Sequence, residues 1–385
     1  MRTTSIALLA SSALAATNWE APPADYSFAQ YQLDFGKSTP YALLGADELS
    51  TKQQVFETNL ATIRAHNADG AQTWKMGLNE FADLTPKEFA GARLAAKGGL
   101  YEPARRAGAL SADEQATFEE HHAGDVAVTA LPAAIDWRAK SNIVTPVKNQ
   151  GGCGSCWAFS TAETLESHIA IATGTLKVFS PQEYVDCAPN PDQCGGTGGC
   201  QGSTQWLGFK YAIGAGIAEE SSYPYKAKTM TCDHDKLVPV ANITGYVRLP
   251  QNNYTALMNA IANVGPIAVS GAAEPWQLYS SGVFTGCSGR SGSDVDHAIQ
   301  AVGYGTDAAK GGDYWIIRNS WGAGWGEKGY IRIARHGASA AGEPCVTDNT
   351  PLDGTGCKDG PKTIQVCGLC GIISDSSYPT GGSLL

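Results

Sequence analysis

Apolar residues recur at helical spacing in the first quarter of the chain. Between residues 24 and 95, Leu49, Phe56, Leu60 and Ile63 lie seven, four and three positions apart within a charged, cysteine-free segment. This spacing places apolar side chains on one face and predicts a long amphipathic helix. Residues 91–130 are rich in alanine and glycine and have no sustained period, which indicates a linker.

The pattern changes near Leu131, where tryptophan, glycine and cysteine become frequent, and we place a domain boundary there. The stretch Cys156–Thr173 repeats apolar residues at helical spacing and ends before Gly174. It predicts an amphipathic helix with Cys156 at its N-terminus. From about residue 264 the apolar runs become short and are broken by glycine: Pro266–Val269, Ala298–Tyr304, Tyr314–Ile317 and Tyr330–Ile333.

Short runs of this kind predict strands of an antiparallel sheet or barrel. The fold class is therefore α+β, with a helical half before a β half and a cleft between them. The 385 residues suffice for two or three units, each with its own core. A net charge of −10 without a run of Lys or Arg argues against nucleic acid or an anionic membrane as partner.

The N-terminus and the cysteines indicate the secretory pathway. Residues 1–16 combine Arg2, an apolar stretch and small residues, which predicts a cleaved signal peptide; an alanine-rich tail is the alternative. All 11 cysteines lie at Cys153 or later, and their odd number implies disulfides plus one free thiol. The sequons at Asn242 and Asn253 predict glycosylation.

The segment Gln150-Gly-Gly-Cys-Gly-Ser-Cys156-Trp carries the most specific chemical signal. A thiol at a helix N-terminus meets backbone N–H groups that favour the thiolate, which makes Cys156 a candidate nucleophile. His297, expected at the start of a strand in the β half, is a candidate partner across the cleft, whereas His168 lies too far along the helix of Cys156. Asn319, at the end of another strand, offers an amide oxygen that would orient His297.

These motifs, in this order, resemble the papain-like cysteine peptidases. The resemblance extends from Leu131 to Pro379 and includes Asp136-Trp-Arg, Ser180-Pro-Gln-Glu, Gly303-Tyr-Gly and Ser377-Tyr-Pro. Upstream, two further patterns are similar to cathepsin L-like propeptides: Glu48, Lys52, Phe56, Asn59, Ile63 and Asn67, then Gly77-Leu-Asn-Glu-Phe-Ala-Asp83. The resemblance implies a zymogen with a signal peptide (1–16), an inhibitory propeptide (17–95), a processing linker (96–130) and a two-lobed peptidase domain (131–385).

The resemblance also implies a role for each site residue. Cys156 attacks the peptide carbonyl, His297 transfers protons, Asn319 orients His297, and Trp321 shields their hydrogen bond. The side chain of Gln150 and the backbone N–H of Cys156 form the oxyanion hole. No cofactor or metal is expected, and the partners are protein or peptide substrates and the chain's own propeptide, with a monomer as the assembly. The final location is the lysosome, the vacuole or the exterior.

Two other functions compete with this one. Cys153–Cys156 and Cys367–Cys370 are both Cys-x-x-Cys pairs, as in disulfide oxidoreductases or zinc sites, but they lack the accompanying βαβ or histidine pattern. A non-catalytic storage protein would lose the nucleophile, which is present here. The resemblance implies disulfides Cys153–Cys200, Cys187–Cys232 and Cys287–Cys370. Four cysteines then have three possible pairings, of which we expect Cys345–Cys357 with Cys194–Cys367.

The resemblance places a specificity pocket for the second residue before the cut at five positions: Ser203, Thr204, Ser270, Val295 and Asp375, with Gln205 beside them. Asp375 would accept a basic side chain if it faces the pocket, and would have no such role if it faces solvent. We expect tolerance of apolar and basic residues, with the basic preference fading in acid. We also expect acid to loosen the propeptide through Glu48 and Asp83. Endopeptidase activity is favoured, although the 337–366 insertion leaves exopeptidase activity open.

Overall fold

The computed structural model describes residues 19–94, 130–289, 292–309, 311–337 and 343–385. The expected signal peptide and nearly all of the expected linker lie outside these ranges. The described residues form an N-terminal segment, a helical lobe and a β lobe, each with its own apolar core. The α+β class is confirmed, and helices precede most of the strands along the chain. None of the described helices is long and apolar enough to cross a membrane.

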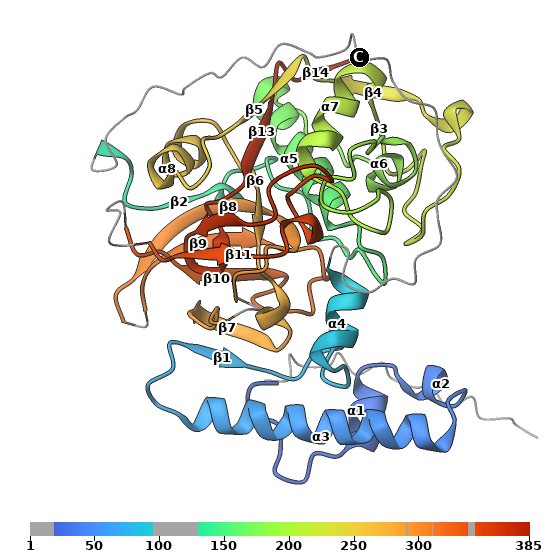
Figure 1. Cartoon of the computed structure of the whole chain (residues 1–385), viewed down its shortest axis with the longest axis vertical. Helices are drawn as coiled ribbons and strands as arrows, with labels where there is room; N and C mark the ends of the chain where they lie inside the picture. The colour runs from blue at the N-terminus through green and yellow to red at the C-terminus, as the bar shows by residue number, and fades with distance from the viewer. Residues whose placement is uncertain (1–18, 95–129, 290–291, 310, 338–342) are drawn as a thin grey trace, which may run out of the picture.

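The N-terminal segment packs beneath the two lobes as a separate unit (Figure 1). Phe56, Leu60 and Ile63 of its longest helix are buried, and the predicted amphipathic helix is confirmed. They pack against Phe28 and Tyr31 of the first helix. The elements of this segment are α1 (Phe28–Asp34), α2 (Ser38–Tyr41), α3 (Ala46–Ala68), β1 (Trp74–Met76) and α4 (Pro86–Arg93).

The helical lobe is built around a helix that differs from the amphipathic one expected. The helix α5 (Cys156–Thr173) is buried on all sides up to Ala170, because it lies between neighbouring helices and the β lobe. Its buried Glu163 is paired with Arg318 and its Glu166 with Lys148. The helix ends at Gly174, whose φ of 74° is left-handed. The lobe also contains α6 (Pro181–Cys187), α7 (Gln205–Ala215), β3 (Ile217–Ala218), β4 (Pro239–Asn242) and the C-terminal β14 (Ser383–Leu384).

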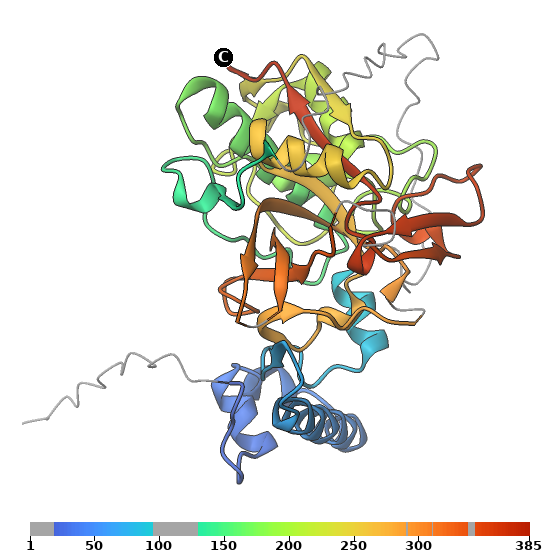
Figure 2. The same cartoon turned by 90° about the vertical axis from the view of Figure 1, so that its left-hand side faces the viewer.

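The β lobe is a nine-stranded sheet in the order β1-β7-β10-β9-β8-β6-β13-β5, with β2 beside β8. All pairs are antiparallel except that of β10 with β7. The strands are β2 (Ile135–Asp136), β5 (Gly245–Arg248), β6 (Ile267–Gly271), β7 (Tyr279–Phe284), β8 (His297–Asp307), β9 (Gly312–Arg318), β10 (Tyr330–Ala334) and β13 (Ser376–Thr380). Helix α8 (Tyr254–Asn263) packs beside them, and Figure 2 shows the N-terminal segment lying below this lobe.

A two-stranded ribbon, β11 (Cys345–Asp348) and β12 (Ile364–Cys367), lies between β10 and β13 in the chain. Its first strand lies in the first half of the expected 337–366 insertion, and its second strand lies at the end of it. Its strands belong to neither the nine-stranded sheet nor the small sheet of β3, β4 and β14.

Candidate active site

Cys156 is the first residue of α5, and its thiol is the one cysteine sulfur outside a disulfide. The backbone amides of Ala298 and Trp157 lie close enough to the sulfur to act on the pKa of its thiol. Ala298 follows His297 at the start of β8. The nucleophile candidate and the histidine candidate therefore come together, although His297 lies 141 positions after Cys156 along the chain.

The pairing of α5 with β8 explains this meeting. Ser160 Oγ donates to the carbonyl of Ile299 at 2.8 Å, and Gln300 Nε2 donates to the carbonyl of Glu163 at 3.0 Å. The helix α5 and the strand β8 thus run side by side in the same direction, and their first residues lie at the same end of the pair. That common end brings Cys156 and His297 together.

The ring of His297 is fixed by two neighbours. Its Nε2 is 2.8 Å from Oδ1 of the buried Asn319, and its centroid is 4.8 Å from that of Trp321. Its buried Nδ1 has no hydrogen-bond partner among the described residues. Because Asn319 holds Nε2, Nδ1 is the nitrogen that remains for the thiol.

While the N-terminal segment is in place, burial is the main influence on the protonation of Cys156 and His297. Desolvation raises the pKa of Cys156 to about 12, although the backbone amides of Ala298 and Trp157 act in the opposite direction. Desolvation also lowers the pKa of His297 to about 4, against the hydrogen bond that its ring donates to Asn319. Between these values the thiol and the imidazole are both neutral. The helix N-terminus does not suffice for a thiolate while water is excluded.

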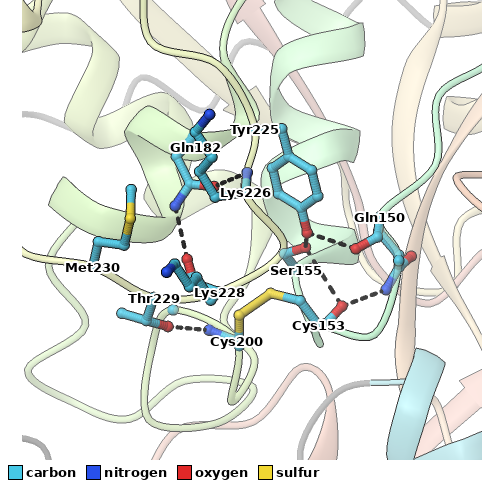
Figure 3. Close-up of a disulfide and its surroundings, with 12 residues drawn as sticks. Gln150, Cys153, Ser155, Gln182, Cys200, Tyr225, Lys226, Lys228, Thr229 and Met230 are labelled. Carbon is cyan, nitrogen blue, oxygen red and sulfur yellow. Dashed lines mark hydrogen bonds between the residues drawn. A yellow bond between two sulfur atoms is a disulfide. The ribbon is translucent and has the colours of Figure 1, made fainter.

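Gln150 is buried in the loop before α5 and is held in place by a small network (Figure 3). Its Oε1 accepts from Ser320 Oγ at 2.6 Å, and its main-chain carbonyl accepts from Tyr225 Oη at 2.7 Å. Its Nε2 donates to the carbonyl of Cys153 at 2.9 Å. Ser155 Oγ lies 2.6 Å from Tyr225 Oη and completes the network.

The N-terminal segment reaches this amide group. Gln150 Nε2 also donates to the main-chain carbonyl of Arg93, the last residue of α4, at 2.9 Å. The guanidinium of Arg93 is anchored by the carbonyl of Gly151 at 2.8 Å. The rings of Phe81 and Phe89 meet Trp321 edge to face, with centroids 6.0 and 5.0 Å away. The segment therefore covers both the Gln150 amide and the Trp321 ring.

A second contact extends the β lobe with a strand of the N-terminal segment. Strand β1 pairs with β7, with Trp74 opposite Gly282. Next to it, Asn79 Nδ2 donates to the carbonyl of Gln277, and Gln277 Nε2 donates to the carbonyls of Phe81 and Leu84. The asparagine of the Gly77–Asp83 motif therefore joins the N-terminal segment to the β lobe, because its side-chain amide satisfies the buried carbonyl of Gln277.

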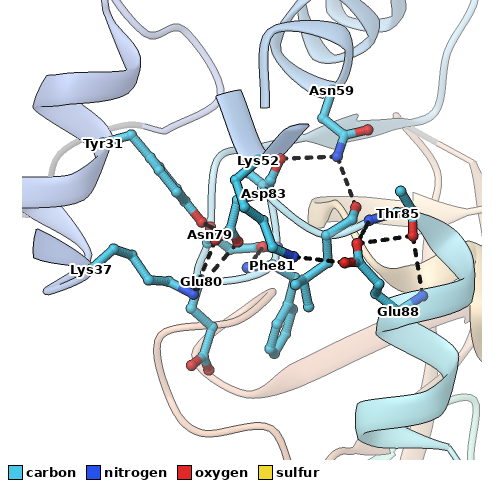
Figure 4. Close-up of polar contacts among 12 residues, drawn as sticks. Tyr31, Lys37, Lys52, Asn59, Asn79, Glu80, Phe81, Asp83, Thr85 and Glu88 are labelled. Carbon is cyan, nitrogen blue, oxygen red and sulfur yellow. Dashed lines mark hydrogen bonds and ion pairs between the residues drawn. The ribbon is translucent and has the colours of Figure 1, made fainter. Parts of the chain in front are cut away.

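Figure 4 shows the polar contacts inside the N-terminal segment. Lys52 pairs with Glu88 at 2.8 Å, and Glu88 closes a capping box with Thr85 at the start of α4. Asp83 lies 3.4 Å from Lys37 and accepts from Tyr31 Oη. Glu48 forms no ion pair with any residue that the structure describes.

The contacts of Asp83 do not support the expected acid trigger there, although Asp83 does pair with Lys37. Desolvation raises the pKa of Asp83 despite Lys37, so its protonation in acid favours the folded segment. The pKa of Glu88 is shifted in the direction that an acid trigger requires. Burial alone would raise the pKa of Glu88, but hydrogen bonds from Lys52 and Thr85 together lower it. Its stabilising contribution is present above the ordinary carboxyl pKa and is lost as the pH falls.

Asp375 faces inward, not towards solvent. Its side chain is 8% exposed, and its Oδ2 accepts from Ser270 Oγ at 2.8 Å and Gln205 Nε2 at 2.7 Å. Its Oδ1 lies 3.7 Å from Arg248, whose guanidinium lies over the ring of Trp206. The other residues of the predicted pocket are buried too: Ser203, Thr204 and Val295.

The disulfides correct part of the expected pairing. Cys153–Cys200, Cys187–Cys232 and Cys287–Cys370 are present. The remaining pairs are Cys194–Cys357 and Cys345–Cys367, so the expected Cys345–Cys357 and Cys194–Cys367 are wrong. The antiparallel register sets Cys345 directly opposite Cys367 across the ribbon, which excludes a short loop closure. Neither Cys-x-x-Cys pair is joined internally, which removes the basis for an oxidoreductase or zinc centre there.

Sequence reasoning did not find Tyr225 and Ser320, which fix Gln150, nor Arg248 beside Asp375. Ser320 lies between two motif residues, so its position was a signal that could have been used. Tyr225 and Arg248 lie outside every recognised motif, and only the fold brings them to the site. The two sequons lie on partly exposed backbone: Asn242 in β4, and Asn253, which caps α8 with its side chain.

A free thiol at a helix N-terminus beside a His–Asn pair, covered by an N-terminal segment, defines a thiol protease precursor. Residues 131–350 match the papain family of cysteine proteases, and residues 28–89 match the cathepsin propeptide inhibitor domain. The chain belongs to the papain family of cysteine proteases and carries an inhibitory propeptide domain.

Named relatives and solved structures agree. The chain is 41% identical to the oryzain beta chain of Oryza sativa subsp. japonica over 90% of its own length and 64% of that protein. It is 41% identical to chymopapain of Carica papaya, over 77% of this chain and 78% of that one. The recombinant stem bromelain precursor superposes with a TM-score of 0.68 at 34% identity, covering 91% of this chain and 99% of that chain. Digestive procathepsin L 3 of Tenebrio molitor gives 0.67 at 32%, covering 91% and 97%.

Proposed function

We propose that the processed protein is a cysteine endopeptidase that uses Cys156 and His297 as its catalytic pair. The thiolate of Cys156 attacks the peptide carbonyl, His297 gives its proton to the leaving amine, and a thioester remains. His297 then takes a proton from water, whose oxygen attacks the thioester; the acid leaves and the thiolate of Cys156 and the protonated His297 are restored. Asn319 orients His297, and Trp321 shields their bond. Gln150 and the backbone N–H of Cys156 stabilise the oxyanion.

The contact of Gln150 with Arg93 carries this proposal. The main-chain carbonyl oxygen of Arg93 lies 2.9 Å from Nε2 of Gln150, where the carbonyl oxygen of a substrate would accept from the same amide. Since the donor is already held by Ser320 and by the main chain around it, little reorganisation is needed when a substrate replaces Arg93.

The precursor is proposed to be divided as the motifs suggest. Residues 1–16 are a signal peptide, residues 17–95 an inhibitory propeptide, residues 96–130 are removed on processing, and residues 131–385 form the peptidase. Five disulfides and two sequons favour the secretory pathway, with a lysosome, a vacuole or the exterior as destination. The substrates are proteins or peptides, and the enzyme acts as a monomer.

The pocket for the second residue before the cut is proposed to accept apolar and basic side chains. Asp375 supplies a carboxylate inside it, held by Ser270 and Gln205. Arg248 lies on the other carboxylate oxygen and competes with a substrate cation. The basic preference should therefore be moderate.

Reporter peptides test this pocket. In the processed enzyme, Asp375→Ala should lower the ratio of Arg-Arg to Phe-Arg reporter turnover by about tenfold, since a charge-assisted bond contributes about 1.5–3 kcal/mol and Arg248 offsets part of it. The control Arg248→Ala should raise the same ratio. Equal ratios in the wild type and Asp375→Ala would show that the carboxylate does not contribute to the selection of a basic side chain.

The mechanism is tested by acid treatment of purified precursor followed by kcat/KM on a Phe-Arg reporter. Wild type should become active, and Cys156→Ala should remain inactive after its propeptide is removed by added protease. Equal activity of the two proteins would exclude Cys156 as nucleophile.

A further inference from the structure

The insertion before the C-terminal strands forms a strap across the two lobes, which we define as residues 343–367. It contains the ribbon of β11 and β12, closed by Cys345–Cys367, and a turn of 3₁₀ helix at Pro351–Asp353.

One end of the strap is attached to the β lobe. Asn252, in the loop before α8, accepts from the amide N–H of Cys367 at 2.9 Å and donates to the carbonyl of Gln365 at 2.9 Å. Val366 is fully buried next to Gly371. The ribbon is therefore a fixed part of this lobe.

The tip of the strap is bound to the helical lobe. Gly195 donates its amide N–H to the carbonyl of Gly356 at 2.8 Å, and Lys358 donates to the carbonyl of Asp192 at 2.9 Å. Cys194–Cys357 closes this contact covalently, over a sequence separation of 163. The other four disulfides each join residues of the same lobe, so this one alone links the two lobes.

The middle of the strap fills the space between the two walls of the proposed pocket. A Cβ atom on Gly354 would lie 1.7 Å from the carbonyl oxygen of Val295, on the β lobe. A Cβ atom on Gly195 would lie 2.2 Å from the carbonyl oxygen of Gly354 and 2.8 Å from that of Ser203, on the helical lobe. Not even a methyl group fits between strap and walls. Ser203 and Val295 are nearly inaccessible to solvent there.

We propose that the strap closes the substrate-binding site beyond the pocket for the second residue before the cut. This inference deepens the proposed peptidase function and depends on it. An extended peptide advances about 3.3 Å per residue, so its third residue would reach the zone between Ser203 and Val295 that Gly354 occupies. The peptide must leave the surface at that point, and its third and fourth residues contribute no binding. The enzyme then selects substrates by the two residues before the cut and by those after it.

A length series of reporters tests the strap. Acetylated peptides with two, three and four residues before the cleaved bond share the same last two residues, and kcat/KM is measured on processed enzyme. The wild type should change by less than about twofold from two residues to four. The double variant Cys194→Ser, Cys357→Ser frees the tip and should gain at least about fivefold from the third residue. The matched control Cys345→Ser, Cys367→Ser keeps the lobe-to-lobe link and should behave like the wild type.

A gain of tenfold or more from the third residue in the wild type overturns the strap proposal, whether or not the variants fold. Cleavage of the two-residue reporter in the same preparation shows that the peptidase is active, so this result leaves the proposed function intact. Failure to cut any of the reporters, together with failure to cut the Phe-Arg reporter, overturns the proposed function and the strap with it.

Discussion

At the scale of single residues, Cys156 is subject to two opposing effects. The N-terminus of α5 and the amides of Ala298 and Trp157 favour a thiolate, while complete burial favours the neutral thiol. Burial is the larger effect while the propeptide covers the site. We expect removal of the propeptide to admit water, to reduce the desolvation of both Cys156 and His297, and to allow the proton to move from sulfur to imidazole. The propeptide would then lower the reactivity of the thiol as well as block access to it.

This balance predicts a change in thiol reactivity on processing. At pH 6, iodoacetamide should alkylate Cys156 at least about a hundredfold faster in processed enzyme than in precursor, because a pKa near 12 leaves almost no thiolate. Intact mass over time measures both rates. Similar rates at pH 6 would contradict the account of the covered pair.

Asn319 provides a second prediction at this scale. Replacing it by alanine leaves Nε2 of His297 without its partner at 2.8 Å in a buried site. The loss of about 1–3 kcal/mol should lower kcat/KM roughly tenfold to a hundredfold, mainly through kcat. A processed Asn319→Ala enzyme with wild-type kcat would exclude the orienting role. Its circular dichroism spectrum and epoxide labelling would show whether the fold is retained.

At the scale of elements, recognisable motifs mark the local structure, and the long-range contacts remain hidden in the sequence. The spacing of apolar residues predicts the helix that begins at Cys156 and the strand that begins at His297. The order of motifs predicts that the first residues of these two elements meet. The burial of α5 on all sides up to Ala170 was not predictable from its pattern, because Glu163 and Glu166 look solvent-facing until their partners Arg318 and Lys148 are known. The sign of the Asp83 response depends in the same way on burial that only the packing of α1 against the Gly77–Asp83 motif provides.

The link between α3 and α4 gives a prediction for acid processing. Glu88 has a lowered pKa, so it stabilises the propeptide above the ordinary carboxyl value of 4.5 and ceases to do so as the pH falls. Glu88→Gln removes this contribution at neutral pH while an oxygen remains for the cap. The pH midpoint of processing should therefore shift upwards.

Gel analysis of processing across pH 3–7 gives the midpoint. The control is Glu57→Gln on the exposed face of α3, where the side chain only meets Gln53. Its midpoint should match that of the wild type. An unchanged midpoint in Glu88→Gln would mean that the acid response originates elsewhere in the propeptide.

At the scale of the whole molecule, the propeptide and the strap act on different parts of the same site. The propeptide covers the Gln150 amide and the Trp321 ring, and adds β1 to the edge of the sheet at β7. The strap lies between Ser203 and Val295. Processing would uncover the first region and leave the second in place, because the strap is part of the peptidase domain and is closed by two disulfides.

Peptide mapping without reduction tests this arrangement in the mature enzyme. The digests should contain the linked pairs Cys194–Cys357 and Cys345–Cys367. Since the first of these spans both lobes, reducing it selectively should lower the melting temperature. A Cys345–Cys357 peptide would contradict both the ribbon register and the strap.

The most direct test of the central claim is covalent labelling with a peptidyl epoxide. After acid processing, the wild-type protein should gain the mass of one inhibitor molecule, located on Cys156, and lose its activity in proportion. The precursor and Cys156→Ala should remain unlabelled. Processed protein that stays unlabelled, or that carries the inhibitor on another residue, would contradict the claim that Cys156 and His297 form the catalytic pair.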